Sequence, residues 1–272
     1  MSASAAEDGR TGRRVFVIIG DPISQVRSPD RFAAVFKEWG IDATLVPMQV
    51  RAEDVGSFLN QIRKVGNVDG VIATIPHKQA VCERASERGP LALATEAANV
   101  LKPIGKSEWA AEIFDGYGSV EAFRRRGIDR SGKRVLIIGA GGAGAALAVA
   151  FRKLTEVGRM RIADIDSERA KALAARVGNA ETGLPDPADF QIVINATPFG
   201  MGSDETPVDS SLLSRDTIVS DAVIKPAKTR LLKEAEAMGC QIVCGGEMLE
   251  WQVESIMRYW GVAPRREQNV KW

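Results

Sequence analysis

One stretch of about thirty residues constrains the fold of this chain more than any other. A short run of branched apolar residues, Val135–Ile138, leads directly into the glycine-rich stretch Gly139–Gly144. A helical run, Ala145–Leu154, and a second apolar run, Met160–Ala163, follow. Strand, glycine loop, helix and strand within about thirty residues is the order of a βαβ unit. We therefore predict a parallel sheet with a helix crossing over between these two strands.

The glycines of this stretch form the pattern GxGxxG, which is weak evidence alone in a chain with 26 glycines. Its position between a strand and a helix strengthens it. The first glycine allows a tight turn, the second lets the backbone approach a pyrophosphate, and the third packs the helix on the strand. Backbone N–H groups at a helix start also favour an anion. We expect a dinucleotide to be bound by Gly139, Gly141, Gly142, Ala143 and Gly144. The alternative is that these glycines serve helix packing alone.

The strand after the glycine loop ends in an acidic residue, Asp164, which lies 25 positions after Gly139. A carboxylate at this place can accept hydrogen bonds from the ribose hydroxyls of NAD. The alternative is that Asp164 and Asp166 only cap the following helix. The two roles are compatible, and we predict the ribose role for Asp164.

The residues around Asp164 favour NAD over NADP. Ile165 follows it where an arginine would be needed to pair with a 2′-phosphate. The nearest arginines are Arg161, within the strand, and Arg169, in the following helix. A carboxylate about 4 Å from a phosphate charge costs on the order of 4 kcal/mol at an effective dielectric constant near 20. We therefore predict NAD as the cofactor.

Apolar strand-like runs and helical runs alternate along most of the remaining chain, which is typical of the α/β class with parallel sheets. We expect further strands at residues 15–20, 43–50, 70–75, 97–101, 109–114, 189–194, 217–221 and 242–244. We expect further helices at residues 29–39, 55–65, 77–88, 119–126, 167–177 and 248–260.

The length of 272 residues suits two domains. We expect residues 1–12 to form a flexible tail. Residues 13–115 together with 246–272 would form a substrate-binding catalytic domain of the α/β class. Residues 116–245 would form a Rossmann-type nucleotide-binding domain inserted into it. The final helix would then return to the first domain.

Charge and composition exclude several classes of protein. The net charge of +1 gives no electrostatic sign of a nucleic-acid or anionic-membrane partner, and we interpret the basic run 124–126 as a solvated helix face. The N-terminus lacks the apolar region of a signal peptide, and no apolar run reaches the ~20 residues of a membrane span. We interpret the three cysteines as core thiols and expect no metal site. We therefore expect a cytoplasmic protein, a monomer or homodimer, with a small-molecule partner and no nucleic-acid or membrane partner.

At six places, in the right order, the chain resembles the shikimate dehydrogenase family, and the resemblance extends from Val15 to Gly261. The segment 20–29, GDPISQVRSP, resembles the family's G-x-P-I-x-H-S-x-S-P loop. Residues 73–78, ATIPHK, resemble the family's N-V-T-x-P-x-K. The asparagine of residues 97–99, AAN, matches the asparagine of G-A-x-N-T. Residues 114–118, FDGYG, resemble N-T-D-G-x-G. The last two are 195–201, NATPFGM, to N-x-T-P-x-G-M, and 246–252, GEMLEWQ, to G-x-M-L-x-x-Q.

This resemblance implies roles for residues that spacing alone would not assign. It implies a lysine–aspartate pair, Lys78 and Asp115, that handles the proton of the substrate alcohol. It implies a substrate site formed by Ser28, Thr74, Asn99 and Gln252. It also implies that the cofactor is contacted by Asn195, Thr197, Pro198 and Gly245.

The lysine and the aspartate are best treated as one coupled unit. A free lysine, with a pKa near 10.4, is a poor base at neutral pH. Burial lowers the pKa of a lysine and a nearby carboxylate raises it. Which of the two takes the proton stays open. His77, the only histidine, directly precedes Lys78. Adjacent side chains at the start of a helix point about 100° apart, so we predict a structural or nucleotide-side role for His77.

Several residues depart from the family's pattern, and two of them stand where the family has residues that bind the substrate carboxylate. In the family that carboxylate is held by a serine pair and by the tyrosine of D-x-x-Y. Here the first serine is replaced by Val26, and the tyrosine by Ile224. Further differences are Gln25, Ile72, Ile113 and Phe114. Each lost hydrogen bond to a charged acceptor is worth roughly 1.5–3 kcal/mol. Arg27 could compensate, and we predict a divergent member for which shikimate is a poor substrate.

Three functions are compatible with these features. The first is an NAD-dependent dehydrogenase acting on a secondary alcohol of a shikimate- or quinate-like cyclic compound. The second is a dehydrogenase-like module that senses a metabolite without turnover, and the third is a folate-linked dehydrogenase of similar layout. Retention of Lys78, Asp115, Asn99 and the glycine loop favours the first.

Overall fold

The computed structural model describes residues 13–262, except residues 25 and 27. By its contacts the described chain divides into two compact units. The first contains residues 13–88, 98–112 and 257–262, and the second contains residues 89–97 and 113–256. The nucleotide-binding domain was expected to contain residues 116–245, and the second unit contains residues 89–97, 113–115 and 246–256 in addition. The tail 1–12, Gln25 and Arg27 lie outside the described residues.

The first unit is built on a mixed six-stranded sheet in the order β2-β1-β3-β5-β6-β4. Its strands are β1 (Arg14–Gly20), β2 (Ala43–Gln49), β3 (Val68–Ala73), β4 (Glu87–Arg88), β5 (Val100–Ile104) and β6 (Glu108–Glu112). Strand β1 pairs in parallel with β2 and β3, whereas β5 is antiparallel to both β3 and β6. The carboxyl ends of β1, β2 and β3 therefore meet at one edge, and β5 starts at that same edge.

The helices of the first unit are α1 (Ser28–Glu38), the short 3₁₀ helix η1 (Ala52–Asp54), α2 (Val55–Ile62) and α3 (Lys78–Glu83). Helix α1 buries Phe32 and Phe36, which pack with Phe16 of β1 and Trp260. The rings of Phe16 and Trp260 stack with centroids 4.2 Å apart. The indole N–H of Trp260 donates to the carbonyl of Leu101 at 3.1 Å. The end of the described chain thus completes the core of the first unit.

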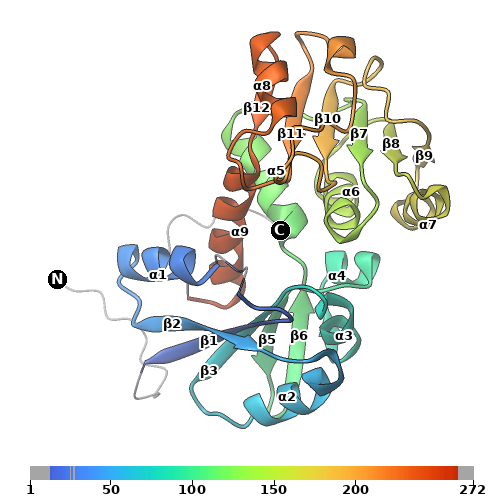
Figure 1. Ribbon diagram of the computed structural model, residues 1–272. Helices are drawn as coiled ribbons and strands as arrows, with labels where there is room; N and C mark the ends of the chain where they lie inside the picture. Colours follow the sequence, from blue (N-terminus) through green and yellow to red (C-terminus); the bar gives the residue numbers. More distant parts are fainter. Residues whose placement is uncertain (1–12, 25, 27, 263–272) are drawn as a thin grey trace. The chain divides into compact units, whose positions relative to one another are not determined.

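The second unit is built on a fully parallel six-stranded sheet. Its strands are β7 (Val135–Ile138), β8 (Met160–Ala163), β9 (Ala180–Thr182), β10 (Ile192–Asn195), β11 (Ile218–Asp221) and β12 (Gln241–Val243). They stand side by side in the order β12-β11-β10-β7-β8-β9 (Figure 1). Counted along the unit, this is the order 3-2-1-4-5-6 of dinucleotide-binding folds read from β9 to β12. The predicted Rossmann-type unit is therefore confirmed.

Helices cover both faces of this sheet. They are α4 (Pro90–Thr95), α5 (Asp115–Arg125), α6 (Gly142–Leu154), α7 (Ser167–Val177), η2 (Ser210–Leu212), α8 (Arg230–Ala237) and α9 (Gly245–Tyr259), whose last three residues belong to the first unit. Alternate residues of β7 face opposite cores. Ile137 packs with Phe123 of α5 and Phe151 of α6, while Leu136 packs with Leu232 of α8.

Two expected helices differ from the structure by four residues or more at one end. The helix expected from residue 119 begins at Asp115, and the helix expected to reach residue 88 ends at Glu83. Glycine is a poor helix former, so Gly116 and Gly118 concealed the first turn of α5 from the sequence. The short elements β9, α4 and α8 were not predicted.

Candidate active site

The glycine loop lies at the point of the second sheet where the strand order reverses. Strands β7 and β10 are neighbours there, although β8 and β9 lie between them in sequence. Ligands of open α/β sheets bind outside the carboxyl ends of the strands at such a point. Gly139 follows β7 with φ of +101°, a left-handed conformation that favours glycine. A Cβ on Gly139 would lie 3.0 Å from backbone atoms of Ala196, just after β10.

The other glycines of the loop differ in what surrounds them. A Cβ on Gly144 would lie 1.8 Å from the carbonyl oxygen of Gly139, so the close approach of α6 to the turn requires glycine. A Cβ on Gly141 or Gly142 would meet nothing within 4 Å, and Gly141, Gly142 and Ala143 are exposed. The start of the thirteen-residue helix α6 is therefore accessible from outside. A helix start is a suitable place for an anion, and the binding of a pyrophosphate by these residues stays a prediction.

The carboxylate of Asp164 is fastened to the glycine loop. Its Oδ2 accepts a hydrogen bond from the backbone N–H of Ala140 at 2.6 Å, and its Oδ1 accepts one from the N–H of Asp166 at 2.8 Å. Arg169, one of the two nearest arginines in the sequence, extends back from α7 to this carboxylate, and its Nη2 lies 2.6 Å from Oδ1. Burial alone would raise the pKa of Asp164, but these hydrogen bonds outweigh it and hold the pKa below its ordinary value.

Asp166 has the capping role that was the alternative for this pair. It is the N-cap of α7, and its side chain accepts hydrogen bonds from the backbone N–H groups of Glu168 and Arg169, both at 3.1 Å. Asp164 makes no such cap bond to the first turn of α7 but binds the glycine loop instead. Asp166 therefore caps α7, whereas Asp164 binds the glycine loop.

The loop after β10 is held by the side chain of Asn195, which is fully buried. Its Oδ1 accepts hydrogen bonds from the N–H of Thr197 at 3.0 Å and from the Thr197 hydroxyl at 2.6 Å. Its Nδ2 donates to the carbonyl of Phe199 at 3.2 Å. Pro198 is exposed between them. The predicted residues Asn195, Thr197 and Pro198 thus form one turn beside the glycine loop.

Sequence reasoning missed a buried carboxylate next to this turn. Asp221 ends β11 and is paired in register with Asn195 at the end of β10. Its Oδ1 accepts hydrogen bonds from Asn195 Nδ2 at 3.0 Å and from the Val223 N–H at 2.9 Å, and its Oδ2 accepts one from the Thr229 hydroxyl at 2.6 Å. Burial raises the pKa of Asp221 despite these hydrogen bonds. The available signal was a polar residue at the end of each of two adjacent apolar strands.

Two predicted site residues meet between α5 and α9 in the second unit. Gln252 Nε2 donates to Asp115 Oδ1 at 2.6 Å. This contact depends on the glycine that follows one turn later, because a Cβ on Gly118 would lie 2.2 Å from the Met248 carbonyl. On the other side of α5, a Cβ on Gly116 would lie 2.4 Å from the Ala146 carbonyl of α6. The glycines after Asp115 therefore let α5 approach both helices closely.

The start of α9 is fixed by a close approach and an ion pair. Gly245, the first residue of α9, has no room for a side chain, because a Cβ there would lie 2.4 Å from the carbonyl oxygen of Val223. Arg126 forms two hydrogen bonds to Glu247, at 2.6 and 2.9 Å. Burial alone would raise the pKa of Glu247, but Arg126 and the N–H of Cys244 hold it below its ordinary value. Part of the basic run 124–126 thus connects two helices.

The predicted substrate residues of the first unit gather at one edge of its sheet. Thr74 follows β3, Lys78 starts α3, Asn99 precedes β5 and Ser28 starts α1 after β1. The carbonyl of Lys78 accepts the N–H of Ala98 at 2.9 Å, and the carbonyl of Asn99 accepts the N–H of Ala73 at 2.8 Å. The structure therefore brings Thr74, Lys78 and Asn99 to the edge where β3 ends, and Ser28 begins the helix that follows β1.

His77 has a structural role, which was one of the two roles predicted for it. It precedes α3, its side chain is 1% exposed, and Nε2 lies 2.7 Å from the carbonyl oxygen of Val50. The ring is thereby occupied in joining the start of α3 to the segment after β2.

The departures from the family pattern fall into two groups. Ile72, Ile113 and Phe114 are buried and contribute to packing. Ile224 is 46% exposed and Val26 is half-buried, so these two remain open to a ligand. Among the departures that the structure describes, Val26 and Ile224 are the accessible ones.

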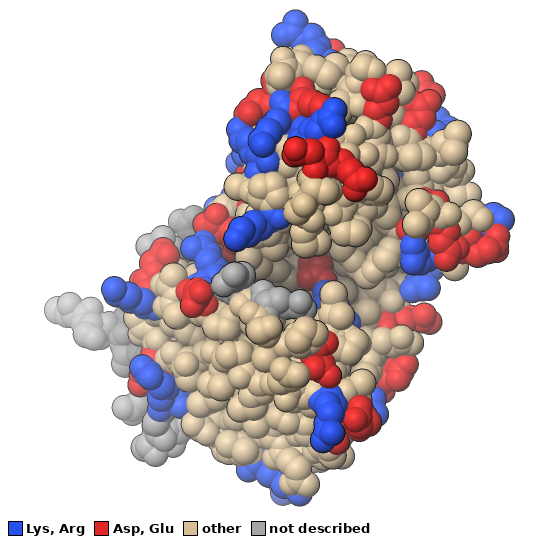
Figure 2. Space-filling model, viewed as in Figure 1, with Lys and Arg blue, Asp and Glu red and all other residues tan. Residues whose placement is uncertain are grey.

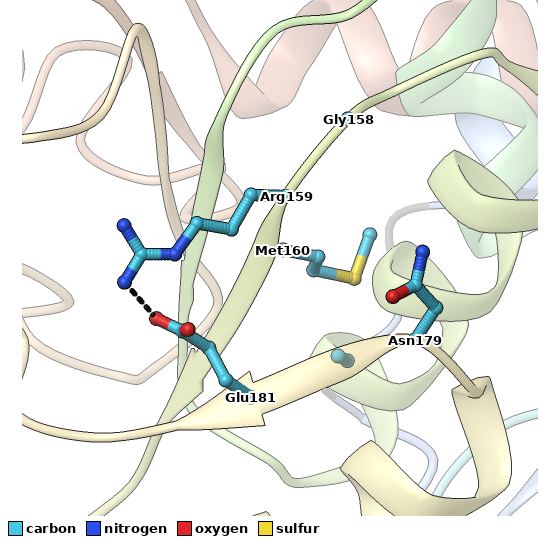
Figure 3. A pocket seen from close by; sticks show the side chains of 6 residues that line it. Gly158, Arg159, Met160, Asn179 and Glu181 are labelled. Atoms are coloured by element: carbon cyan, nitrogen blue, oxygen red, sulfur yellow. Dashed lines mark ion pairs between the residues drawn. The ribbon is translucent and has the colours of Figure 1, made fainter.

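A cavity of about 430 Å³ lies elsewhere in the second unit, at the amino ends of β8 and β9 (Figure 3). One wall is formed by the ion pair of Arg159 with Glu181 at 2.7 Å, and Met160 and Asn179 line the opposite part. Because ligands of such sheets bind at the carboxyl ends, this cavity is not the dinucleotide site.

On the face drawn in Figure 2, acidic and basic side chains are interspersed. Among the residues that the structure describes, no helix has the length and apolar character needed to cross a bilayer. Within the same residues, no three His, Cys, Asp or Glu side chains are grouped as metal ligands.

Comparison with known proteins gives a consistent result. The family model for the shikimate dehydrogenase substrate binding domain matches residues 18–101. A curated relative from Thermococcus kodakarensis, named shikimate dehydrogenase (NADP(+)), is 36% identical over 261 residues, covering 92% of each chain.

Solved structures show the same similarity. The 5-ketofructose reductase of a Gluconobacter strain matches with a TM-score of 0.86 and 26% identity, over 92% of this chain and 94% of that one. The quinate dehydrogenase of Corynebacterium glutamicum, solved in complex with NAD, matches with a TM-score of 0.84 and 27% identity, over 91% and 93%.

Proposed function

We propose that this chain, which belongs to the shikimate dehydrogenase family, uses NAD to oxidise a secondary alcohol of a shikimate- or quinate-like cyclic hydroxy compound. Membership in the family makes the chain a dehydrogenase acting on a CH–OH group with a nicotinamide cofactor. The choice of NAD, the substrate and the residue roles are the proposal.

The observation that carries the choice of NAD is the position of Asp164. Its side chain is 5% exposed and is fixed against the glycine loop by the Ala140 N–H. A carboxylate held beside that loop can accept hydrogen bonds from the ribose hydroxyls of NAD. The quinate dehydrogenase of similar fold was solved with NAD, whereas the curated relatives are named for NADP+. Arg169 partly neutralises Asp164, so we expect a preference for NAD and not complete rejection of NADP.

We assign the proton of the alcohol to Lys78 and Asp115. The bound nicotinamide supplies the hydride acceptor. Alcohol oxidation also releases a proton from oxygen, which a residue within hydrogen-bond reach must accept. Gln252 Nε2 donates to Asp115 Oδ1 at 2.6 Å, and this hydrogen bond fixes the position of the carboxylate.

The proposed substrate follows from the polar residues of the family's pattern that this chain keeps and from those that it replaces. Ser28, Thr74 and Asn99 keep polar groups at the edge of the first sheet. Ile224 and Val26 place apolar groups where the family holds a carboxylate. We therefore propose a cyclic hydroxy compound bound mainly through its hydroxyl groups, with a weaker dependence on a carboxylate than shikimate has. The similar fold of a 5-ketofructose reductase supports a substrate without that group.

A screen of NAD reduction tests this function. The panel contains shikimate, quinate, their amino and deoxy relatives, and neutral cyclic diols. We expect turnover with at least one cyclic hydroxy compound, and poor turnover of shikimate. The double variant Val26→Ser plus Ile224→Tyr should raise kcat/KM for shikimate at least tenfold, because it restores two hydrogen bonds to a charged acceptor.

Two outcomes would contradict the proposal. A low KM for shikimate in the unaltered protein would show that the replaced residues do not weaken carboxylate binding. Tight binding of NADH and of a panel compound without any turnover would favour the metabolite-sensing module.

A further inference from the structure

The buried carboxylate of Asp221 lies where three segments of the second unit come together. These are the turn 196–201 after β10, the loop 222–229 after β11, and the start of α9. The turn contains predicted cofactor residues, the loop contains Ile224, and α9 contains Gln252. Asp221 itself is 1% exposed, so solvent and ligands do not reach it.

The first connection runs from Asp221 to the turn. Asn195 Nδ2 donates to Asp221 Oδ1, which fixes the orientation of the Asn195 amide. Its other atom, Oδ1, is thereby left to accept both hydrogen bonds from Thr197. A rotated amide would present donors to the Thr197 N–H, so the geometry of the turn depends on the carboxylate behind it.

The second connection runs to both ends of the loop 222–229. The N–H of Val223 donates to Oδ1 at the start of the loop, and the hydroxyl of Thr229 donates to Oδ2 at its end. Residues 224–228 between these anchors are exposed. Thr229 is also the N-cap of α8, and its Cγ2 lies 2.8 Å from the position of a Cβ on Gly200. The end of the loop therefore packs against the turn.

The third connection runs through Val223 to α9. The Val223 carbonyl lies 2.4 Å from the place of a Cβ on Gly245, so the backbone held by Asp221 rests directly on the first residue of α9. A carboxylate that accepts from an amide, a hydroxyl and a backbone N–H at once satisfies all three buried donors. An apolar residue at this position would leave them without acceptors.

From this geometry we infer that Asp221 is a positioning residue for the turn 196–201 and for the loop 222–229. It orders both before the cofactor binds, so binding does not have to supply that ordering. The inference rests on the proposed function only in taking the turn as part of the cofactor site.

The variants separate positioning from folding. Asp221→Ala removes both acceptor oxygens and with them all three hydrogen bonds. Asp221→Asn keeps the acceptor for Asn195 and Val223 and can donate its own amide to the Thr229 hydroxyl. Thr229→Val removes one connection only. Thr217→Ala is the control, because Thr217 is 2% exposed at the opposite end of the same strand region, directly before β11.

Two readouts are measured for each variant: hydrogen exchange of the cofactor-free protein, and NADH affinity by fluorescence titration. We expect Asp221→Ala to speed exchange in residues 196–201 and 222–229 with little change in β7 and β8. We expect its NADH Kd to rise at least tenfold, that of Thr229→Val to rise about threefold, and Asp221→Asn to stay within about threefold of the unaltered protein. Thr217→Ala should lower the Tm without changing the Kd. If Asp221→Ala does not fold, Thr229→Val and Asp221→Asn still give the comparison.

The inference is overturned if exchange in the two loops is unchanged in Asp221→Ala and Thr229→Val. It is also overturned if Thr217→Ala weakens NADH binding as much as the Asp221 and Thr229 variants do. If the unaltered protein binds neither NADH nor NADPH, the proposed function fails. The exchange data then still decide whether Asp221 orders the two loops.

Discussion

At the residue scale, the glycine loop shows what spacing alone can specify. Three glycines were predicted from their order, and each has its own physical reason in the structure: a positive φ at Gly139, open space at Gly141 and a close approach at Gly144. Spacing could not reveal Asp221 or Arg169, because their importance depends on neighbours that are distant in sequence.

A pair of alanine substitutions separates packing from ligand binding in this loop. Gly144→Ala would place a Cβ 1.8 Å from the Gly139 carbonyl, so we expect a loss of several degrees in Tm and loss of NADH binding. Gly141→Ala meets nothing within 4 Å, so we expect an unchanged Tm but at least tenfold weaker NADH binding. Thermal melts and NADH titration measure both. An unchanged affinity for NADH in Gly141→Ala would show that the pyrophosphate does not bind at this position.

The proposed proton transfer is tested by removing each member of the pair. We expect Lys78→Ala and Asp115→Ala each to lower kcat about a hundredfold or more, on the ~10²–10⁴ scale of general acid–base catalysis. The double variant should lose much less than the product of the two effects, because the residues act as one unit. Lys64→Ala, at an exposed lysine outside the site, is the control. Near-normal kcat in either single variant would exclude that residue from the mechanism.

At the element scale, tertiary packing decides what the sequence concealed. Helix α5 starts at Asp115 although two glycines stand in its first turn, because α6 and α9 approach it too closely for side chains. Propensity disfavours glycine in a helix by about 1 kcal/mol relative to alanine, and close packing overrides that preference here. Strands β7 and β8, which are apolar and follow clear turn signals, were predicted with the correct ends.

The ion pair between α5 and α9 gives a pH-dependent contribution to stability. Arg126 holds the pKa of Glu247 below its ordinary value, so the stabilisation is present above the pKa of the unfolded chain and is lost as pH falls through the folded-state pKa. We expect Arg126→Met to lower stability by about 1 kcal/mol or less at pH 7, since the pair is partly exposed. The difference in Tm from the unaltered protein should shrink toward pH 4. A difference that grows in acid would contradict this assignment.

At the scale of the whole molecule, the alternation of strands and helices was enough to predict two α/β units and the Rossmann-type topology of the second. It was not enough to predict the mixed sheet of the first unit. The direction of β5 depends on its pairing with β3, which local periodicity does not encode. The assignment of segment 89–97 to the second unit depends in the same way on contacts with distant residues such as those of α6.

The central claim is that this family member uses NAD, and steady-state kinetics with both cofactors tests it most directly. With the best substrate of the panel, we expect kcat/KM to be at least tenfold higher with NAD than with NADP, a difference of about 1.4 kcal/mol. Asp164→Ala should narrow this ratio, because it removes both the acceptor for the ribose hydroxyls and the charge opposed to a 2′-phosphate. Asp166→Ala, which removes only the cap of α7, should leave the ratio unchanged. An equal or higher kcat/KM with NADP, or an unchanged ratio in Asp164→Ala, would contradict the account.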